Sequence, residues 1–184
     1  MIDETAMQRG TGAMGLALAA VLALSSVSAQ AQEAEGDAAA TLLTPLAIVA
    51  VEGLEFGILA VSPAGDCLYA LDPAGTTSKS GDGRCAFLSG ATYNGRFKVD
   101  CGADKLVQFS LFYTDLAPAG VTFGAPADPM QVDAAKPGGL FQLLSCDSDG
   151  RSVVKAGGSL LVTPKAQSGF SGRVGTIRLE VSYD

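Results

Sequence analysis

Residues 176–184 read Thr-Ile-Arg-Leu-Glu-Val-Ser-Tyr-Asp, an unbroken alternation of apolar and polar side chains. Successive side chains of a β-strand point to opposite sides of the sheet, so a period of two is typical of a strand that buries one face. The stretch therefore predicts a closing strand with a buried face, at an edge that is paired or is meant to be paired. The residues of that apolar face are Ile177, Leu179, Val181 and Tyr183.

Short strand-like runs recur upstream of this stretch, and turn sequences separate them. Two of the separators are Asp-Pro-Ala-Gly at 72–75 and Lys-Pro-Gly-Gly at 136–139. Their residues supply the fixed φ, the positive φ and the Asx turns that connect strands. We expect strands over residues 67–71, 84–88, 95–101, 106–113, 121–124, 130–133, 140–146, 159–164 and 173–183.

No segment after the N-terminal region sustains a three-to-four-residue apolar period over three turns. The 23 glycines and eight prolines of the chain suit turns, and a helical domain would tolerate them poorly. Many short strands joined by such turns predict an all-β protein, an antiparallel β-sandwich.

The N-terminal region has the pattern of a secretory signal peptide. An apolar run at 15–24 is followed by Ala29-Gln30-Ala31, a small-residue cleavage pattern. We expect a signal peptide over 1–31, a flexible lead-in over 32–45 and a sandwich domain over 46–184. The protein is then exported through the inner membrane, with no membrane span in the mature chain. Periplasm, cell surface and extracellular space all stay open as destinations.

The segment 46–51 is apolar on both of its faces. One face carries Leu46, Ile48 and Ala50, and the other carries Ala47, Val49 and Val51. A strand that is apolar on both sides is typical of burial between two layers. Two interpretations of this candidate assembly strand remain open: it folds back into its own sandwich, or it adds to the sandwich of a neighbouring molecule.

The four cysteines are Cys67, Cys85, Cys101 and Cys146, and in an exported protein an even number predicts disulfides. Three pairings are possible. We favour Cys67–Cys85 with Cys101–Cys146, because the first pair brackets a Gly-rich turn region. The loop-entropy model gives these bonds about 3 and about 4 kcal/mol of stabilisation. A zinc site would need close Cys-x-x-Cys pairs or histidines, and the sequence has neither.

The chain contains no histidine, which excludes Ser-His-Asp and Cys-His catalysis and the common His-based metal sites. Most of the Asp and Glu residues neighbour Gly, Pro or Ser, which is typical of turns. The Asp-x-Asp-Gly run at 147–150 resembles the start of a calcium-binding loop, but it lacks the acidic ligands that follow later in such a loop. We expect no enzyme activity, catalytic residue, metal or cofactor.

The net charge of −7 is spread along the sequence without a cluster of Lys or Arg, which argues against nucleic acid and anionic lipid as partners.

Four stretches, in order, cover about residues 46–183: Leu-Glu-Phe-Gly at 54–57, the run 81–87 followed by Gly-Arg-Phe-Lys-Val at 95–99, Gly-Gly-Ser-Leu-Leu-Val at 157–162, and the closing run from Gly172 to Tyr183. In this order they resemble secreted bacterial pilin-like β-sandwich domains, similar in style to spore coat protein U and chaperone–usher pilins. The chain departs from that pattern in its second cysteine pair and in Ser-Gly-Phe-Ser-Gly at 168–172, where the family usually has Gly-x-Tyr.

The resemblance implies an immunoglobulin-like sandwich and a role at the cell surface. We expect a non-catalytic structural subunit of a surface fibre or surface layer. Its partners would be copies of itself or related subunits, joined by strand addition, and a periplasmic chaperone. The alternative is a monomeric secreted module that binds carbohydrate or another surface.

Overall fold

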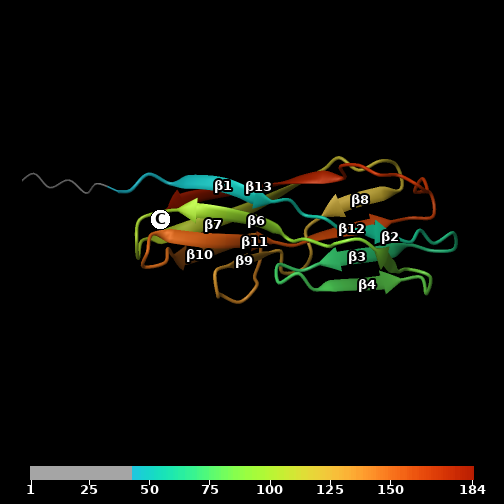
Figure 1. The fold of residues 1–184 in the computed structure, drawn as a ribbon, viewed down its shortest axis with the longest axis horizontal. Coiled ribbons are helices and arrows are strands. Elements are labelled where there is room, and N and C mark those ends of the chain that lie inside the picture. The colour runs from blue at the N-terminus through green and yellow to red at the C-terminus, as the bar shows by residue number, and fades with distance from the viewer. Residues whose placement is uncertain (1–42) are drawn as a thin grey trace, which may run out of the picture. The chain divides into compact units, whose positions relative to one another are not determined.

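The computed structural model describes residues 43–184, and Figure 1 traces them as a ribbon. The described residues belong to one compact unit, Thr41–Asp184. The predicted signal peptide at 1–31 and all but the end of the predicted lead-in at 32–45 lie outside the described residues. Within residues 43–184 the protein is all-β, as the sequence predicts, and contains no helix. The described residues accordingly include no helix with the length and hydropathy of a membrane span.

In the described part of the chain, thirteen strands form four antiparallel sheets. The sheets have the strand orders β1-β6-β11-β9, β10-β7-β13, β4-β3-β12-β8 and β2-β5. The strands are β1 Ala47–Glu52, β2 Ile58–Leu59, β3 Cys67–Leu71, β4 Thr77–Gly81, β5 Phe87–Ser89, β6 Gly95–Asp100, β7 Leu106–Asp115, β8 Val121–Gly124, β9 Met130–Val132, β10 Phe141–Ser145, β11 Arg151–Ala156, β12 Gly158–Val162 and β13 Gly175–Tyr183.

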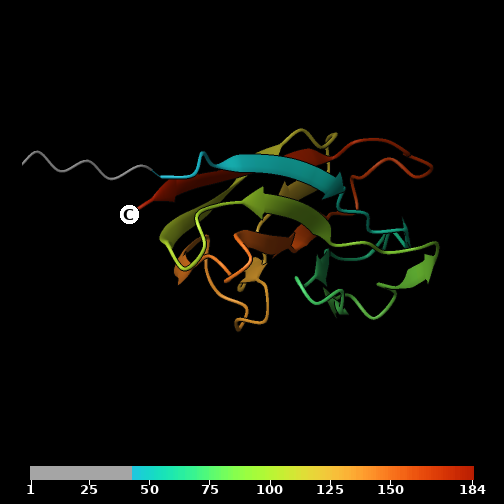
Figure 2. The same ribbon diagram turned by 60° about the vertical axis from the view of Figure 1, so that its left-hand side comes forward.

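The first core lies between the sheet of β6 and β11 and the sheet of β7 and β13. Every second residue of β6 is buried, and Val99 is fully enclosed. Phe109 of β7 is also fully enclosed. This alternation is the arrangement expected when two sheets pack face to face and each keeps one face toward solvent. Figure 2 shows β1 (cyan) running along the outside of β6 (green).

The second core lies under β3, β8 and β12. Tyr69 and Leu71 of β3 are fully buried there, and Phe56 packs edge-on against Phe123 of β8 at 6.5 Å between ring centroids. Tyr113 packs against both cores, because β7 is long enough to reach the second one. The two cores therefore share a strand pair, β7 with β13, which runs past both.

Gly157 stands where the chain leaves the first sheet and enters the third, between β11 and β12. A side chain at this position would lie 2.4 Å from the carbonyl oxygen of Leu71, so only glycine fits the crossing. The hydroxyl of Tyr113 donates a hydrogen bond of 2.6 Å to the carbonyl oxygen of Gly157. Tyr113 thus ties the crossing to β7.

Replacing Tyr113 by phenylalanine is expected to lower the free energy of unfolding by about 1 kcal/mol at neutral pH, because the carbonyl of Gly157 loses its donor. Burial raises the pKa of Tyr113 well above its ordinary value. In the unfolded chain a tyrosine titrates near pH 10, so above that pH the unfolded state binds fewer protons and the wild-type protein loses stability as pH rises.

The difference between the wild-type protein and Tyr113→Phe should therefore shrink between about pH 9 and pH 11. Urea unfolding of both proteins across that range measures it. Titration of the other tyrosines and of the lysines is common to the two proteins and cancels in the difference. A difference that stays constant with pH would contradict the burial of this hydroxyl.

The disulfides are Cys67–Cys85 and Cys101–Cys146, the pairing favoured from the sequence. The first has a Cα–Cα distance of 5.5 Å and belongs to the second core; the other has 6.2 Å and belongs to the first core. All four cysteines are buried. Each core is therefore crossed by one covalent link between segments that are distant in the sequence.

Candidate functional site

The candidate assembly strand 46–51 corresponds to β1, which lies at the edge of its sheet and pairs antiparallel with β6 of the same molecule. Ala47 pairs with Asp100 and Val49 with Lys98, and the register shifts between Ala50 and Glu52. In an antiparallel pair, alternate residues direct their N–H and C=O groups toward the partner and the others direct them away. Since β1 has no second strand beside it among the described residues, it presents a free edge.

The prediction that this strand is buried between two layers is wrong. Val49 is 57% exposed, Val51 48% and Ile48 40%. The physical reason is its position at the edge of the sheet, where only one side is occupied, by β6. An edge strand with apolar side chains on both faces is unusual, because natural edges commonly carry charge or proline that discourages pairing with another chain.

The two faces of β1 have different surroundings. Ile48 stands opposite Val99, and Ala50 opposite Phe97, so both lie on the side of the sheet that faces the core. Leu46, just before the strand, is partly buried and packs against the first core. The opposite face, which includes Val49, looks outward. On the core-facing side of this segment, Leu46 is partly buried, and Ile48 and Ala50 after it are exposed.

The closing strand corresponds to β13, which pairs with β7 over its whole length. Its apolar face points toward the cores: Leu179 is buried, and Ile177, Val181 and Tyr183 are partly buried and pack against the first core. Its pairing with β7 leaves it at the edge of the sheet opposite β10.

Tyr183 connects the closing strand to the chain in front of β1. Its hydroxyl donates a hydrogen bond of 2.6 Å to the carbonyl oxygen of Thr44 and accepts one of 2.7 Å from the N–H of Gly102. Thr44 itself is exposed, and the residues between it and β1 include Pro45. The tyrosine hydroxyl therefore acts as a latch that holds the start of β1 against the turn after β6.

The change Tyr183→Phe is expected to loosen the start of β1, because the Gly102 N–H and the Thr44 carbonyl both lose a partner. Hydrogen exchange of residues 46–50 should become faster, while exchange in β7 and β11 should be unchanged. Tyr93→Phe is the matched control, since that tyrosine is 44% exposed and remote from Thr44 in sequence. Equal exchange of β1 in both variants would contradict the latch.

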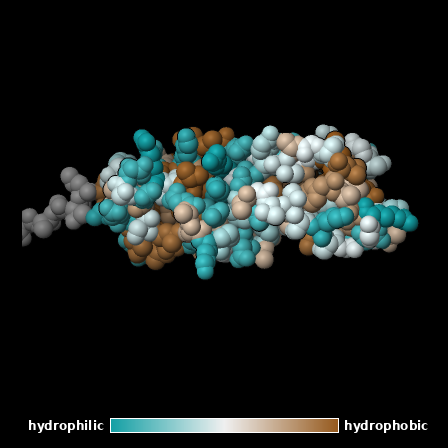
Figure 3. All heavy atoms as spheres, turned by 60° about the horizontal axis from the view of Figure 1, so that its bottom comes forward, coloured by the Kyte–Doolittle hydropathy of each residue, from teal (hydrophilic) through white to brown (hydrophobic). Residues whose placement is uncertain are grey.

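A groove of about 950 Å³ begins where β1 ends. Its walls come from residues 50–59 and Val61, from the connection between β12 and β13, and from the inner sides of β8 and β12. Most of the lining is apolar, and Glu52, Glu55 and Arg173 are its charged members. Ile58 and Phe170 are exposed at 56% and 42%, and Figure 3 shows how hydrophobic surface (brown) alternates with polar surface on one face of the molecule. The apolar lining members include Leu54, Phe56, Ile58, Phe123, Leu160 and Ile177.

The Asp-x-Asp-Gly run at 147–150 forms a turn. The carbonyl of Asp147 accepts a hydrogen bond from the N–H of Gly150, and the carboxylate of Asp149 accepts one from the N–H of Arg151. Gly150 has a φ of +76°, which glycine adopts without strain. Among the described residues, no group of three or more Asp, Glu, Cys or His side chains is placed to hold a metal ion.

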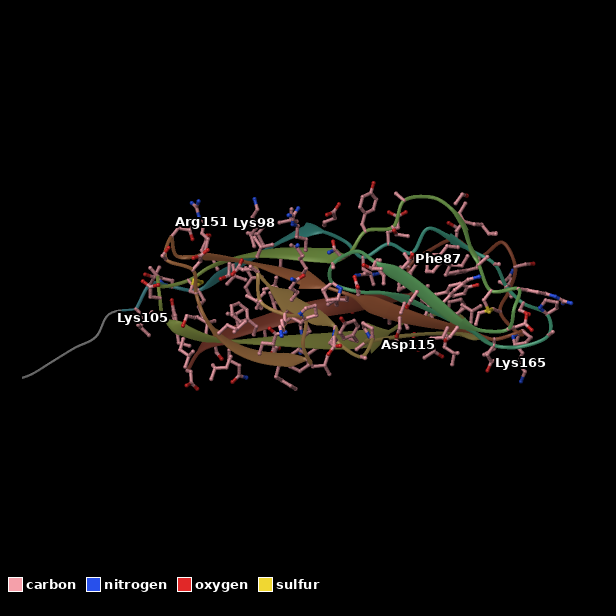
Figure 4. The ribbon with its side chains drawn as sticks, turned by 90° about the horizontal axis from the view of Figure 1, so that it is seen from below. Phe87, Lys98, Lys105, Asp115, Arg151 and Lys165 are labelled. Carbon is pink, nitrogen blue, oxygen red and sulfur yellow. A yellow bond between two sulfur atoms is a disulfide. The ribbon has the colours of Figure 1, made fainter. Side chains whose placement is uncertain are left out.

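A cluster of four basic residues was not predicted from the sequence. Arg96 and Lys98 project from β6, and Arg151 and Lys155 from the neighbouring β11, all on the outer face of the sheet. Figure 4 shows Lys98 and Arg151 extending from the same side of the ribbon. The signal in the sequence is the spacing of two between Arg96 and Lys98, but the second strand is 50 residues away, so only the pairing of β6 with β11 brings the four together.

Comparison of this chain with models of protein families, with curated proteins and with solved structures found no match.

Proposed function

We propose that the protein is a non-catalytic, exported structural subunit of a surface fibre or surface layer, and that β1 is the strand through which copies join. One observation carries the proposal: β1 is apolar on both faces but lies exposed at a sheet edge. Burial of its side chains is favourable at about 25 cal/mol per Å² of apolar surface, and its own fold leaves much of that surface in water. A second molecule can supply the missing cover.

Strand addition is the form of association that suits this edge. Main-chain hydrogen bonds along the free edge supply affinity, and alternate side chains fill apolar depressions in the acceptor. The groove next to the end of β1 has an apolar lining of this kind. Leu46, Ile48 and Ala50 form one row of alternate side chains on the strand, and Ala47, Val49 and Val51 form the other.

The two disulfides support the proposal from another side. They cross the two cores, and neither bond involves β1, which is joined to the rest of the sandwich only through the main chain after Glu52. The strand can therefore leave β6 while each core remains closed by its own bond. The oxidised cysteines are also compatible with export to an oxidising compartment.

The test uses the protein without residues 1–31. Size-exclusion chromatography and electron microscopy should show multimers for this form, and deletion of residues 46–52 should abolish them. The deleted form should also have a lower melting temperature, and a synthetic peptide of residues 44–53 added in trans should raise it again through binding.

Two results would overturn the proposal. One is a clean monomer at every accessible concentration. The other is a deletion variant that folds unaided with an unchanged melting temperature and does not respond to the peptide, because β1 would then contribute nothing that another strand could replace.

A further inference from the structure

The outer face of β6 and β11 concentrates positive charge on an acidic protein. Arg96 stands directly opposite Lys155, and Lys98 is the diagonal neighbour of Lys155 and of Arg151 in the same pairing. Directly opposed side chains in a sheet have Cβ atoms about 5 Å apart and diagonal ones about 7 Å. Like charges at these separations repel, so the fold bears an electrostatic cost on this face that an anionic ligand would offset.

Four carboxylates border the four cations. Asp100 lies 3.7 Å from Arg151, and Glu52 stands opposite Arg96 in the pairing of β1 with β6. Asp133 and Asp149 border the same face, because their carboxylates accept hydrogen bonds from the N–H groups of Val153 and Arg151. The positive charge is therefore concentrated locally, where Arg96, Lys98 and Lys155 lie next to one another. Arg96, Lys98 and Lys155 have no ion pair within 4.0 Å in the described part of the chain.

The shallow shape of this face indicates which class of ligand it can bind. The cations project from two central strands of a sheet, so they form a shallow surface. None of the four cations lines the groove of about 950 Å³, which meets this sheet only at residues of β1 and β6 and their ends: Ala50, Val51, Glu52, Gly95 and Phe97. A shallow cationic surface suits an extended polymer with regularly spaced anions better than a small enclosed ligand.

Side chains around the cluster are aliphatic or polar rather than aromatic. Val49 stands beside Lys98 on one side and Val153 on the other, and Gln131 stands beside Lys155. Proteins that bind single-stranded nucleic acid combine cations with aromatic rings on which bases stack. The absence of such a ring among these paired neighbours favours a polymer recognised by charge and by hydroxyl contacts.

We propose that the outer face of β6 and β11 binds an acidic polysaccharide, one that carries carboxylate or sulfate groups along its chain. Arg96, Lys98, Lys155 and Arg151 are the residues that contact its anions, with Arg151 shared between the ligand and Asp100. This site is separate from the strand exchange proposed above and does not depend on it.

The experiment measures binding of the protein without residues 1–31 to polyuronate, to heparin, to neutral dextran and to an oligo-dT strand, at about 20 and about 150 mM salt. Polyuronate or heparin should bind, with affinity that falls steeply as salt rises. The double change Lys98→Glu/Lys155→Glu should weaken this binding about tenfold or more.

The matched control is Lys105→Glu/Lys165→Glu. These two lysines are exposed, they lie away from the sheet face as Figure 4 shows, and their replacement changes the net charge by the same amount. The control variant should keep most of the binding. Circular dichroism and urea unfolding should show that Lys98→Glu/Lys155→Glu remains folded, because the change relieves repulsion with Arg96 and Arg151.

Four results would overturn the proposal. Equal loss in the control variant would mean that net charge alone governs binding. Tighter binding of oligo-dT than of either acidic polysaccharide would assign the face to nucleic acid. Absence of binding to polyuronate and heparin at low salt, or equal binding to dextran, would show that the charged face is a solvated surface.

Discussion

Removal of the Cys101–Cys146 disulfide by the double change C101A/C146A is expected to lower the free energy of unfolding by about 4 kcal/mol. The two cysteines are 45 residues apart in sequence, so the bond restricts a long loop in the unfolded chain. Cys101 follows β6 and Cys146 follows β10, which places the bond between the two sheets that enclose the first core. A domain of this size has a total stability of only about 5–15 kcal/mol, so the loss is a large part of it.

Urea unfolding followed by circular dichroism measures the effect. The comparison variant is C67A/C85A, whose cysteines are 18 residues apart and whose expected loss is about 3 kcal/mol. A loss below about 2 kcal/mol for C101A/C146A would contradict the loop-entropy explanation. A larger loss for C67A/C85A than for C101A/C146A would show that packing around the sulfur atoms outweighs loop length.

The regular strands with one buried face were predictable from the sequence. Predicted segments 67–71 and 121–124 have the bounds of β3 and β8, and the closing strand 173–183 differs from β13 by two residues at its start. In β6 the alternation of buried and exposed residues is complete. These strands can be predicted from the sequence because packing against a second sheet requires an apolar residue at every second position.

Two strands that do not carry an apolar residue at every second position, β4 and β11, were missed. β4, Thr77–Gly81, is polar and exposed at every position, because it pairs with β3 alone and covers no core. β11, Arg151–Ala156, buries Ser152, Val154 and Ala156, and the small or polar side chains at its ends hide the alternation. Missing β11 also concealed the basic face, since two of its four cations belong to this strand.

The exposure of β1 could not be predicted from its sequence, because the same apolar run suits a central strand and an edge strand. What decides is whether another strand lies beyond it, and that depends on segments far away in the chain or on another molecule. Within a single molecule, β1 pairs with β6 alone and is therefore an edge strand. The disagreement between pattern and position is therefore informative: sequence and fold conflict at the strand to which we assign assembly.

Phe109→Ala is expected to destabilise the protein by about 4 kcal/mol, the range typical of phenylalanine truncation in a closed core. Phe109 is fully buried in the middle of β7, the strand that pairs with both β10 and β13. Neighbours on two sheets surround it, so they can collapse only partly into the space that the ring leaves. Chemical unfolding by urea measures the loss.

Phe141→Ala is the matched control, because Phe141 lies on β10, the strand paired with β7, and is 62% exposed. It makes one edge-to-face contact with Phe112, at 6.3 Å between ring centroids, so its loss should cost at most about 1 kcal/mol. Similar losses for the two variants would contradict the position of the first core between the sheets. A small loss for both would mean that β7 does not form the centre of the fold, and the closing strand, which depends on β7 for every one of its pairs, would lose its place as well.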